Sequence, residues 1–155
     1  MTLSKLFEEE EIIRSHVKDI AQLILELSDF VVATRVLDLA QAEVLGKKVQ
    51  NVCDKLNTHV HKARKLLGIL MTKKTSVLFK GKQVLLPDIE NDLSLIHGDV
   101  DSIGRIGLDF YKAENRGAAF ENLERHYDDL VEHVTNLVVD DTELKDLPRN
   151  LFVKK

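Results

Sequence analysis

The stretch TSVLFKGKQVLLPD, residues 75–88, divides this chain, because helical sequence patterns run almost unbroken up to it and resume immediately after it. Two short apolar runs flank a Lys-Gly-Lys sequence, which is typical either of a short β-hairpin or of an apolar loop packed over the end of a helical bundle. An isolated two-stranded hairpin is only marginally stable, so we expect the packed loop. Pro87 and Asp88 then predict the start of a helix, with Asp88 as its N-cap.

Composition and charge limit the class of protein. A chain of 155 residues with 44% hydrophobic and 31% charged residues, 7 Gly and 2 Pro is typical of a helix-rich globular protein. The formal charge of -4 leaves no general basic surface, so we expect no binding of nucleic acid. The single cysteine excludes an internal disulfide framework, and the acidic N-terminus does not resemble a signal peptide. Because no apolar stretch approaches about 18 residues, we expect a cytoplasmic protein without membrane insertion.

Two helices are predicted before this dividing stretch. Apolar residues at spacings of three and four indicate an amphipathic helix over residues 3–27. A second apolar stripe keeps a heptad register from Val32 to Leu70, apart from one slip beside Ala42, and predicts a helix of about 40 residues that is either continuous or broken near Gly46. So long a stripe needs a partner along its whole length, which favours an antiparallel bundle or a coiled-coil-like dimer.

Several reactive side chains of the first half have plain structural interpretations. Cys53 falls on the apolar stripe, so we expect a small buried hydrophobe in preference to a reactive thiol. His59 and His61 are two residues apart and lie on different helical faces, so we place both at helix edges facing water and do not pair them as metal ligands. The four glutamates at 8–11 suit the positive end of the helix dipole, so we interpret them as helix-stabilising residues and not as an acidic binding tract.

The second half repeats this plan. Apolar residues from Ile89 to Phe110 at spacings of four and three predict one helix, and the Asn-Arg-Gly sequence at 115–117 predicts its end, with Gly117 in the left-handed conformation. A further helix follows on the apolar residues between 120 and 137. These patterns predict an all-α fold, an antiparallel bundle of about four main helices with an internal two-fold repeat.

The dividing stretch also sets the predicted organisation of the chain. We expect a first helical unit at 1–74, a linker at 75–88 and a second unit at 89–155, with both units sharing one core. The tail after Asp140 contains an apolar segment at 151–153 that either closes the bundle or forms an oligomer contact, and the sequence leaves both open.

An internal repeat supports this division. Residues 50–60 align with residues 124–134 at a constant offset of 74 residues and share the heptad phase. Four residue types in this alignment are identical, among them the pairs Asp54 with Asp128 and His59 with His133. The shared phase indicates that each half is one copy of a helical unit.

Carboxylates within the repeat are candidate metal ligands. Glu124 and Asp128 are four residues apart and therefore share one helical face, and Asp54 takes the matching position in the first copy, where Gln50 replaces the leading glutamate. Such acids on facing helices would form an oxygen-rich site for a divalent metal ion, whereas the alternative is a solvated helix edge. Ferritin-like and hemerythrin-type ligand patterns, a phosphate loop and an HExxH motif are absent from the sequence, and nothing marks a catalytic nucleophile.

Three segments, at residues 124–132, 50–54 and 87–103, resemble segments of the PhoU-like helical proteins. This family comprises the phosphate-uptake regulator and its shorter archaeal and bacterial relatives. The segment Glu124-Arg-His-Tyr-Asp128, followed by Glu132, resembles the acidic motif of this family, and residues 50–54 resemble a degraded first copy. Residues 87–103 are similar to the segment that opens the second half of the shorter relatives. In pattern, the resemblance covers residues 12–137.

The resemblance implies a non-enzymatic, cytoplasmic regulatory or adaptor protein that forms homo-oligomers and acts by contact with a phosphate transporter or a sensor kinase. It also implies, for some members, metal clusters on the acidic motifs, here at Asp54, Glu124, Asp128 and Glu132, with iron, zinc or another divalent metal. Two alternatives stay open from the residues alone: a structural or interaction bundle without metal, and a metal-dependent enzyme on a helical bundle.

Overall fold

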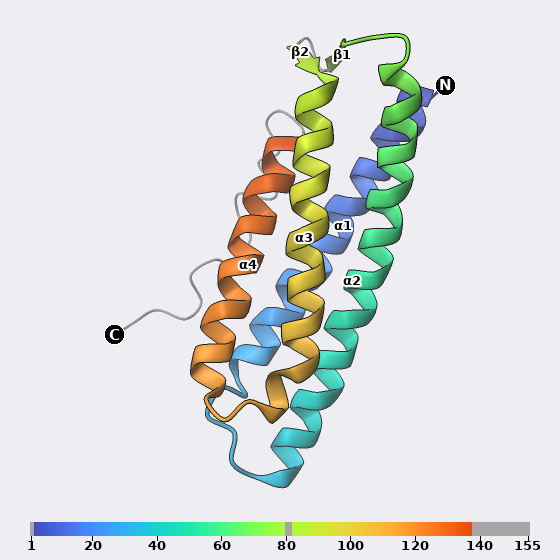
Figure 1. Ribbon diagram of the computed structural model, residues 1–155. Coiled ribbons are helices and arrows are strands. Elements are labelled where there is room, and N and C mark those ends of the chain that lie inside the picture. Colours follow the sequence, from blue (N-terminus) through green and yellow to red (C-terminus); the bar gives the residue numbers. More distant parts are fainter. Residues whose placement is uncertain (1, 80–81, 138–155) are drawn as a thin grey trace.

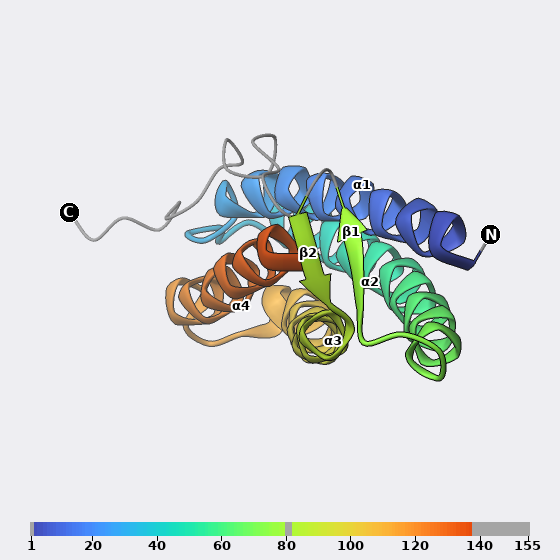
Figure 2. The ribbon, with the colours of Figure 1, turned by 90° about the horizontal axis from the view of Figure 1, so that it is seen from above.

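The computed structural model describes residues 2–79 and 82–137, which form a bundle of four antiparallel helices with a small hairpin at one end (Figures 1 and 2). The predicted all-α antiparallel bundle is therefore confirmed. None of the described helices combines the length and apolarity needed to span a membrane. The elements in chain order are α1 (Thr2–Ser28), α2 (Val36–Met71), β1 (Ser76–Phe79), β2 (Lys82–Leu85), α3 (Leu86–Asp109), the short 3-10 helix η1 (Phe110–Lys112) and α4 (Arg116–Leu137).

One hydrophobic core runs through all four helices. The predicted apolar stripes of α1, α3 and α4 face this core, and the stripe of α2 is buried from Ala42 to Leu70. The first two predicted members of that stripe are instead exposed: Val32, by 83%, precedes the start of α2, and Val36, by 84%, is its first residue. The largest fully buried side chains, each stabilising the fold by about 1.5–3 kcal/mol, are Tyr127, Phe110, Phe120, Ile13, Ile20, Ile24, Leu27, Leu56, Leu67, Leu86, Leu93 and Ile96.

Glycines allow α2 and α3 to approach closely, and α2 is continuous through Gly46. A Cβ atom on Gly46 would overlap the carbonyl oxygen of Gly107, and a Cβ atom on Gly107 would lie 2.9 Å from Cγ1 of Val49. A Cβ atom on Gly104 would lie 3.3 Å from Cβ of Cys53. The two predicted units therefore share a tight helix–helix contact, whereas their division at residues 75–88 stays a prediction.

Residues 75–88 contain a β-hairpin, so the packed loop that we expected is wrong. β1 pairs with β2 in antiparallel register, from Ser76 opposite Leu85 at its open end. Val77 of the hairpin is buried, and Leu86, which follows it directly, is fully buried. Contact with the bundle therefore supplies the stability that an isolated hairpin lacks.

Two predicted helix ends also differ from the structure. The N-cap of α3 is Leu85, so Asp88 lies in the first turn, where its carboxylate still favours the positive end of the helix. Gly117, predicted to end a helix, lies inside α4. Asn115 precedes α4, and its Oδ1 accepts a hydrogen bond of 3.0 Å from the backbone N–H of Ala118, which is the contact of an N-cap.

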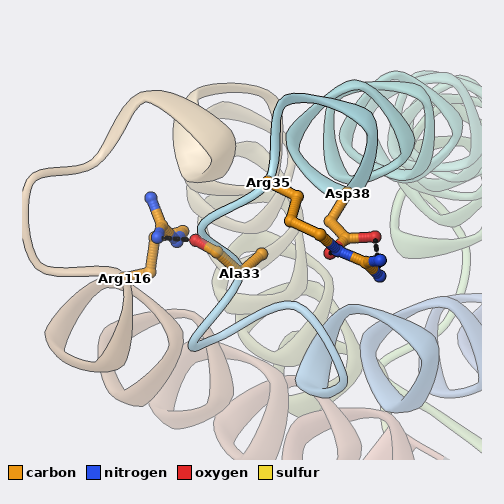
Figure 3. Close-up of polar contacts among 4 residues, drawn as sticks. All are labelled: Ala33, Arg35, Asp38 and Arg116. Carbon is orange, nitrogen blue, oxygen red and sulfur yellow. Dashed lines mark hydrogen bonds and ion pairs between the residues drawn. The ribbon is translucent and has the colours of Figure 1, made fainter.

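Two arginines form polar contacts at the bundle end that carries the helix–helix loops (Figure 3). Arg116, at the start of α4, donates a hydrogen bond from Nη2 to the carbonyl oxygen of Ala33, in the loop between α1 and α2. This contact joins the first helical hairpin to the second. Arg35 donates from Nε to Oδ2 of Asp38 at 2.7 Å and from Nη2 to Oδ1 at 3.1 Å, a pair exposed enough to contribute little to stability.

Candidate metal centre

The structure separates the residues that the sequence predicted as metal ligands. Asp54 is exposed on α2 and lines a groove that also includes His97 of α3. Glu124 and Asp128 line a different groove, on α4, and Glu132 is exposed further along that helix. Helices α2 and α4 lie diagonally in the bundle, each against α3 (Figure 2). The two copies of the acidic motif therefore do not face one another, and metal binding by these residues stays a prediction.

A different set of metal-ligating side chains meets between α3 and α4. Asp99 comes from α3, whereas His126 and Asp129 come from one face of α4. One ligand atom of each residue lies within 4.8 Å of the others. Asp99 and His126 are half-buried and Asp129 is exposed, so the cluster is open to solvent.

A second histidine of α4 holds Asp99 in place. Nδ1 of His133 donates a hydrogen bond of 2.6 Å to Oδ2 of Asp99, and the two side chains are 23% and 13% exposed. This bond leaves the other carboxylate oxygen of Asp99 available to a cation. Hydrogen bonds that orient a ligating group in this way commonly strengthen metal binding in proteins.

The surroundings of the cluster disfavour its negative charge. Burial raises the pKa of Asp99 above its ordinary value of 3.8, the hydrogen bond and charge of His133 oppose this rise, and the neighbouring carboxylate of Asp129 adds to it. Burial also raises the pKa of Asp92, seven residues earlier on α3, although the nearby His133 opposes this. A bound cation would stabilise the ionised form of both groups.

The donor set fits a divalent transition metal. Two carboxylates and one imidazole are ligands that zinc, iron and manganese accept, whereas calcium prefers a larger set of oxygen atoms. Three protein ligands also leave coordination positions for water or a further ligand. The residues present therefore fit an ion of the class that the family resemblance implies, at a different position.

The first helical hairpin contains a related contact. Nδ1 of His59 on α2 donates a hydrogen bond of 2.6 Å to Oε2 of Glu9 on α1. His59 aligns with His133 in the internal repeat, so each hairpin has a histidine–carboxylate bond between its two helices. The alignment places Lys55 at the position of Asp129. A cationic side chain therefore takes the place of a carboxylate ligand in the first hairpin.

The prediction that His59 faces water is wrong, and the glutamates at 8–11 lie beyond the first turn of α1, which begins at Thr2. Glu9 and His59 are half-buried against one another, and Glu10 is only 4% exposed and forms an ion pair of 2.6 Å with Arg14. The interpretation of Cys53 is confirmed, because it is 2% exposed and burial raises the pKa of its thiol to about 12.

The sequence contained a signal for the metal centre that we missed. His126, Asp129 and His133 are spaced by three and four residues, which places them on one face of a helix. This His-x2-Asp-x3-His spacing differs from a pair of carboxylates four residues apart, from Glu with His three residues later, and from two His four residues apart. Asp99 has no local signal, since it joins the others only through the packing of α3 on α4.

Comparisons with known proteins give no identification, because no family model, curated protein or solved structure matches the chain. The fold and the cluster therefore define a class of protein only: a four-helix bundle with a candidate metal centre between α3 and α4.

Proposed function

We propose that this protein is a non-enzymatic regulatory or adaptor bundle that binds a divalent transition-metal ion and acts by contact with a partner protein. The observation that carries the proposal is the convergence of Asp99, His126 and Asp129 within 4.8 Å between two helices. The ion would join α3 to α4 through these three side chains, with His133 orienting Asp99. Metal binding would thus stiffen the second hairpin and change the surface that a partner meets.

The charge of the second hairpin supports this proposal. Residues 86–137 contain 12 Asp and Glu against 4 Lys and Arg, a formal charge of -8 (4 minus 12). Residues 2–71 contain 10 of each kind and are balanced. Self-repulsion therefore acts mainly on the second hairpin, and a bound dication reduces it.

The proposed partner rests on the family resemblance. Residues 124–132 and 87–103 resemble segments of PhoU-like regulators, which suggests a phosphate transporter or a sensor kinase as the partner, a cytoplasmic location and assembly into homo-oligomers. The order of the four antiparallel helices is compatible with this family, although many bundles share it.

Metal analysis of tag-free protein tests the metal centre. We expect close to one transition-metal ion per chain in the native protein and a loss of that ion in the double variant His126→Ala/Asp129→Asn. The matched control is Glu124→Gln/Asp128→Asn, which changes two side chains of the same helix outside the cluster and should retain the ion.

Two other outcomes of this metal analysis would contradict the proposed metal centre. Loss of the ion only in the Glu124→Gln/Asp128→Asn control would support the site predicted from the acidic motif and would overturn the centre proposed here. Absence of metal from all three proteins, also after incubation with Zn²⁺, Fe²⁺ or Mn²⁺, would leave a structural or interaction bundle.

Co-purification from native membranes tests the partner. Cross-linking followed by mass spectrometry should recover a phosphate permease or a sensor kinase with the native chain, and less of it with the His126→Ala/Asp129→Asn variant. Recovery of neither protein, under conditions that retain known membrane complexes, would contradict the regulatory role but leave the metal centre standing.

A further inference from the structure

A second histidine cluster lies in the first hairpin, away from the proposed metal centre. His16 of α1 and His59 of α2 face one another with ring centroids 5.6 Å apart and an interplanar angle of 32°. His59 is held by its hydrogen bond of 2.6 Å to Glu9, and Lys55 lies one helical turn before His59. The cluster thus connects α1 and α2 through the Glu9 carboxylate and the two imidazoles.

The two histidines differ in how they can accommodate a proton. His59 has a carboxylate partner for its Nδ1–H group. Nδ1 of His16 is buried and has no hydrogen-bond partner among the described residues. The nearest carboxylate oxygen, Oδ2 of Asp19, is 3.7 Å away on a side chain that is 61% exposed, so it compensates a charge on His16 only weakly.

Apart from Asp19, the groups that act electrostatically on His16 are Lys55, which is positive, and His59, which becomes positive on protonation. Burial lowers the pKa of His16 below its ordinary value of 6.5, and the neighbouring His59 and Lys55 lower it further, whereas only Asp19 opposes them. Glu10, earlier on α1, is paired with Arg14. The folded hairpin therefore favours neutral His16.

We infer that the contact between the rings of His16 and His59 is an acid-sensitive latch, which holds α1 against α2 while His16 is neutral and loosens α1 when His16 takes up a proton. The direction follows from linkage. The unfolded or opened chain binds the proton at a higher pH than the closed hairpin does. The stabilisation that neutral His16 contributes is therefore fully present above the ordinary pKa of histidine. It decreases as the pH falls towards the lowered pKa of His16 in the folded protein. One proton changes the opening equilibrium by at most about tenfold per pH unit in this window.

Amide hydrogen exchange of the full chain tests this latch, with mass spectrometric detection at about pH 7.5 and about pH 5.5 and rates corrected for intrinsic exchange. A chelator in all samples removes any contribution of the metal centre. We expect α1 to open more readily at the lower pH by up to about tenfold per pH unit, with a smaller change in α3. The variant His16→Gln should remove most of this increase. His61→Gln, an exposed histidine of α2, is the matched control and should behave as the native chain does.

A second variant keeps the test decisive if His16→Gln fails to fold. Replacement of Lys55 by Gln removes a positive charge near His16, so the titration midpoint of the His16 ring, followed by NMR, should rise towards its ordinary value. A His16 midpoint at the ordinary histidine value in the native chain, or equal acid-induced opening in native and His16→Gln proteins, would overturn the latch. Either result would leave the metal centre untouched, because none of these residues contacts Asp99, His126 or Asp129.

Discussion

The two helical hairpins of this protein contain the same polar contact in opposite electrostatic settings. In each, a histidine of the second helix donates a hydrogen bond of 2.6 Å to a carboxylate of the first helix, His59 to Glu9 and His133 to Asp99. The internal repeat then places Lys55 in the first hairpin at the position of Asp129 in the second. The same alignment places Val52 at the position of His126, so the first hairpin lacks both ligands that α4 contributes to the candidate metal centre.

The two hairpins thus use one kind of histidine–carboxylate contact beside different neighbouring charges. The hydrogen bond requires only that two helical faces meet at the right register, and both hairpins satisfy that requirement. The chemistry of each cluster then depends on the other polar side chains beside this histidine–carboxylate hydrogen bond. An ammonium group makes the first cluster sensitive to protons, whereas a carboxylate and His126 make the second cluster suitable for a divalent ion.

The largest expected effect comes from placing a lysine, as at position 55 of the first hairpin, at the aligned position 129 of the second. The substitution Asp129→Lys should weaken metal affinity by about 100-fold or more, because it removes a ligand and adds a like charge beside the ion. Folding should persist, since Asp129 is exposed. Isothermal titration with Zn²⁺ measures the affinity, and far-UV circular dichroism checks the fold.

Glu132→Lys is the matched control for this substitution. It makes the same change of charge at an exposed position of α4 that the acidic motif had predicted as a ligand. We expect a much smaller loss of affinity, from long-range repulsion alone. Equal losses in the two variants would mean that net charge, and not the cluster, controls metal binding.

A smaller effect is expected from breaking the shared hydrogen bond. His133→Ala and His59→Ala each leave a half-buried carboxylate without its donor and should each lower the free energy of unfolding by about 1–3 kcal/mol. Only His133→Ala should also weaken metal binding, by about 10- to 100-fold, because only Asp99 is a proposed ligand. Urea unfolding and metal titration of both variants measure these changes. A similar loss of metal affinity in both would contradict the separate roles of the hairpins.

The smallest effect concerns pH. Burial raises the pKa of Asp99, so its carboxyl group takes up a proton at a higher pH in the folded protein than in the unfolded chain. Metal affinity should therefore begin to fall before the pH reaches the ordinary range of aspartate, by about tenfold per pH unit for each proton displaced. Affinity measured over a pH series tests this expectation. An affinity that is constant down to the ordinary pKa of aspartate would show that Asp99 is not a ligand.

Much of the fold could be predicted because helical periodicity is local. Spacings of three and four residues identified all four helices and nearly all their buried positions, among them Ile13, Cys53, Ile96 and Tyr127. The formation of the β-hairpin and the exact helix ends were harder to predict. The hairpin of β1 and β2 is marginal by itself and forms against the bundle. The helix ends predicted at Asp88 and Gly117 were wrong, because α3 already begins at Leu86 and ends at Asp109, and Asn115 caps the start of α4.

By itself the sequence determined the four amphipathic helices, their order and the equivalence of His59 with His133, since these depend on residue type and spacing along one chain. Only the tertiary structure decided which carboxylate meets each histidine. Glu9 is 50 residues from His59 and Asp99 is 34 residues from His133. Their contacts depend on the register and crossing of α1 with α2 and of α3 with α4, which the burial of the shared core favours. For the same reason, acids that share a motif at Asp54 and Asp128 lie apart, whereas Asp99 and His126, which share no motif, lie together.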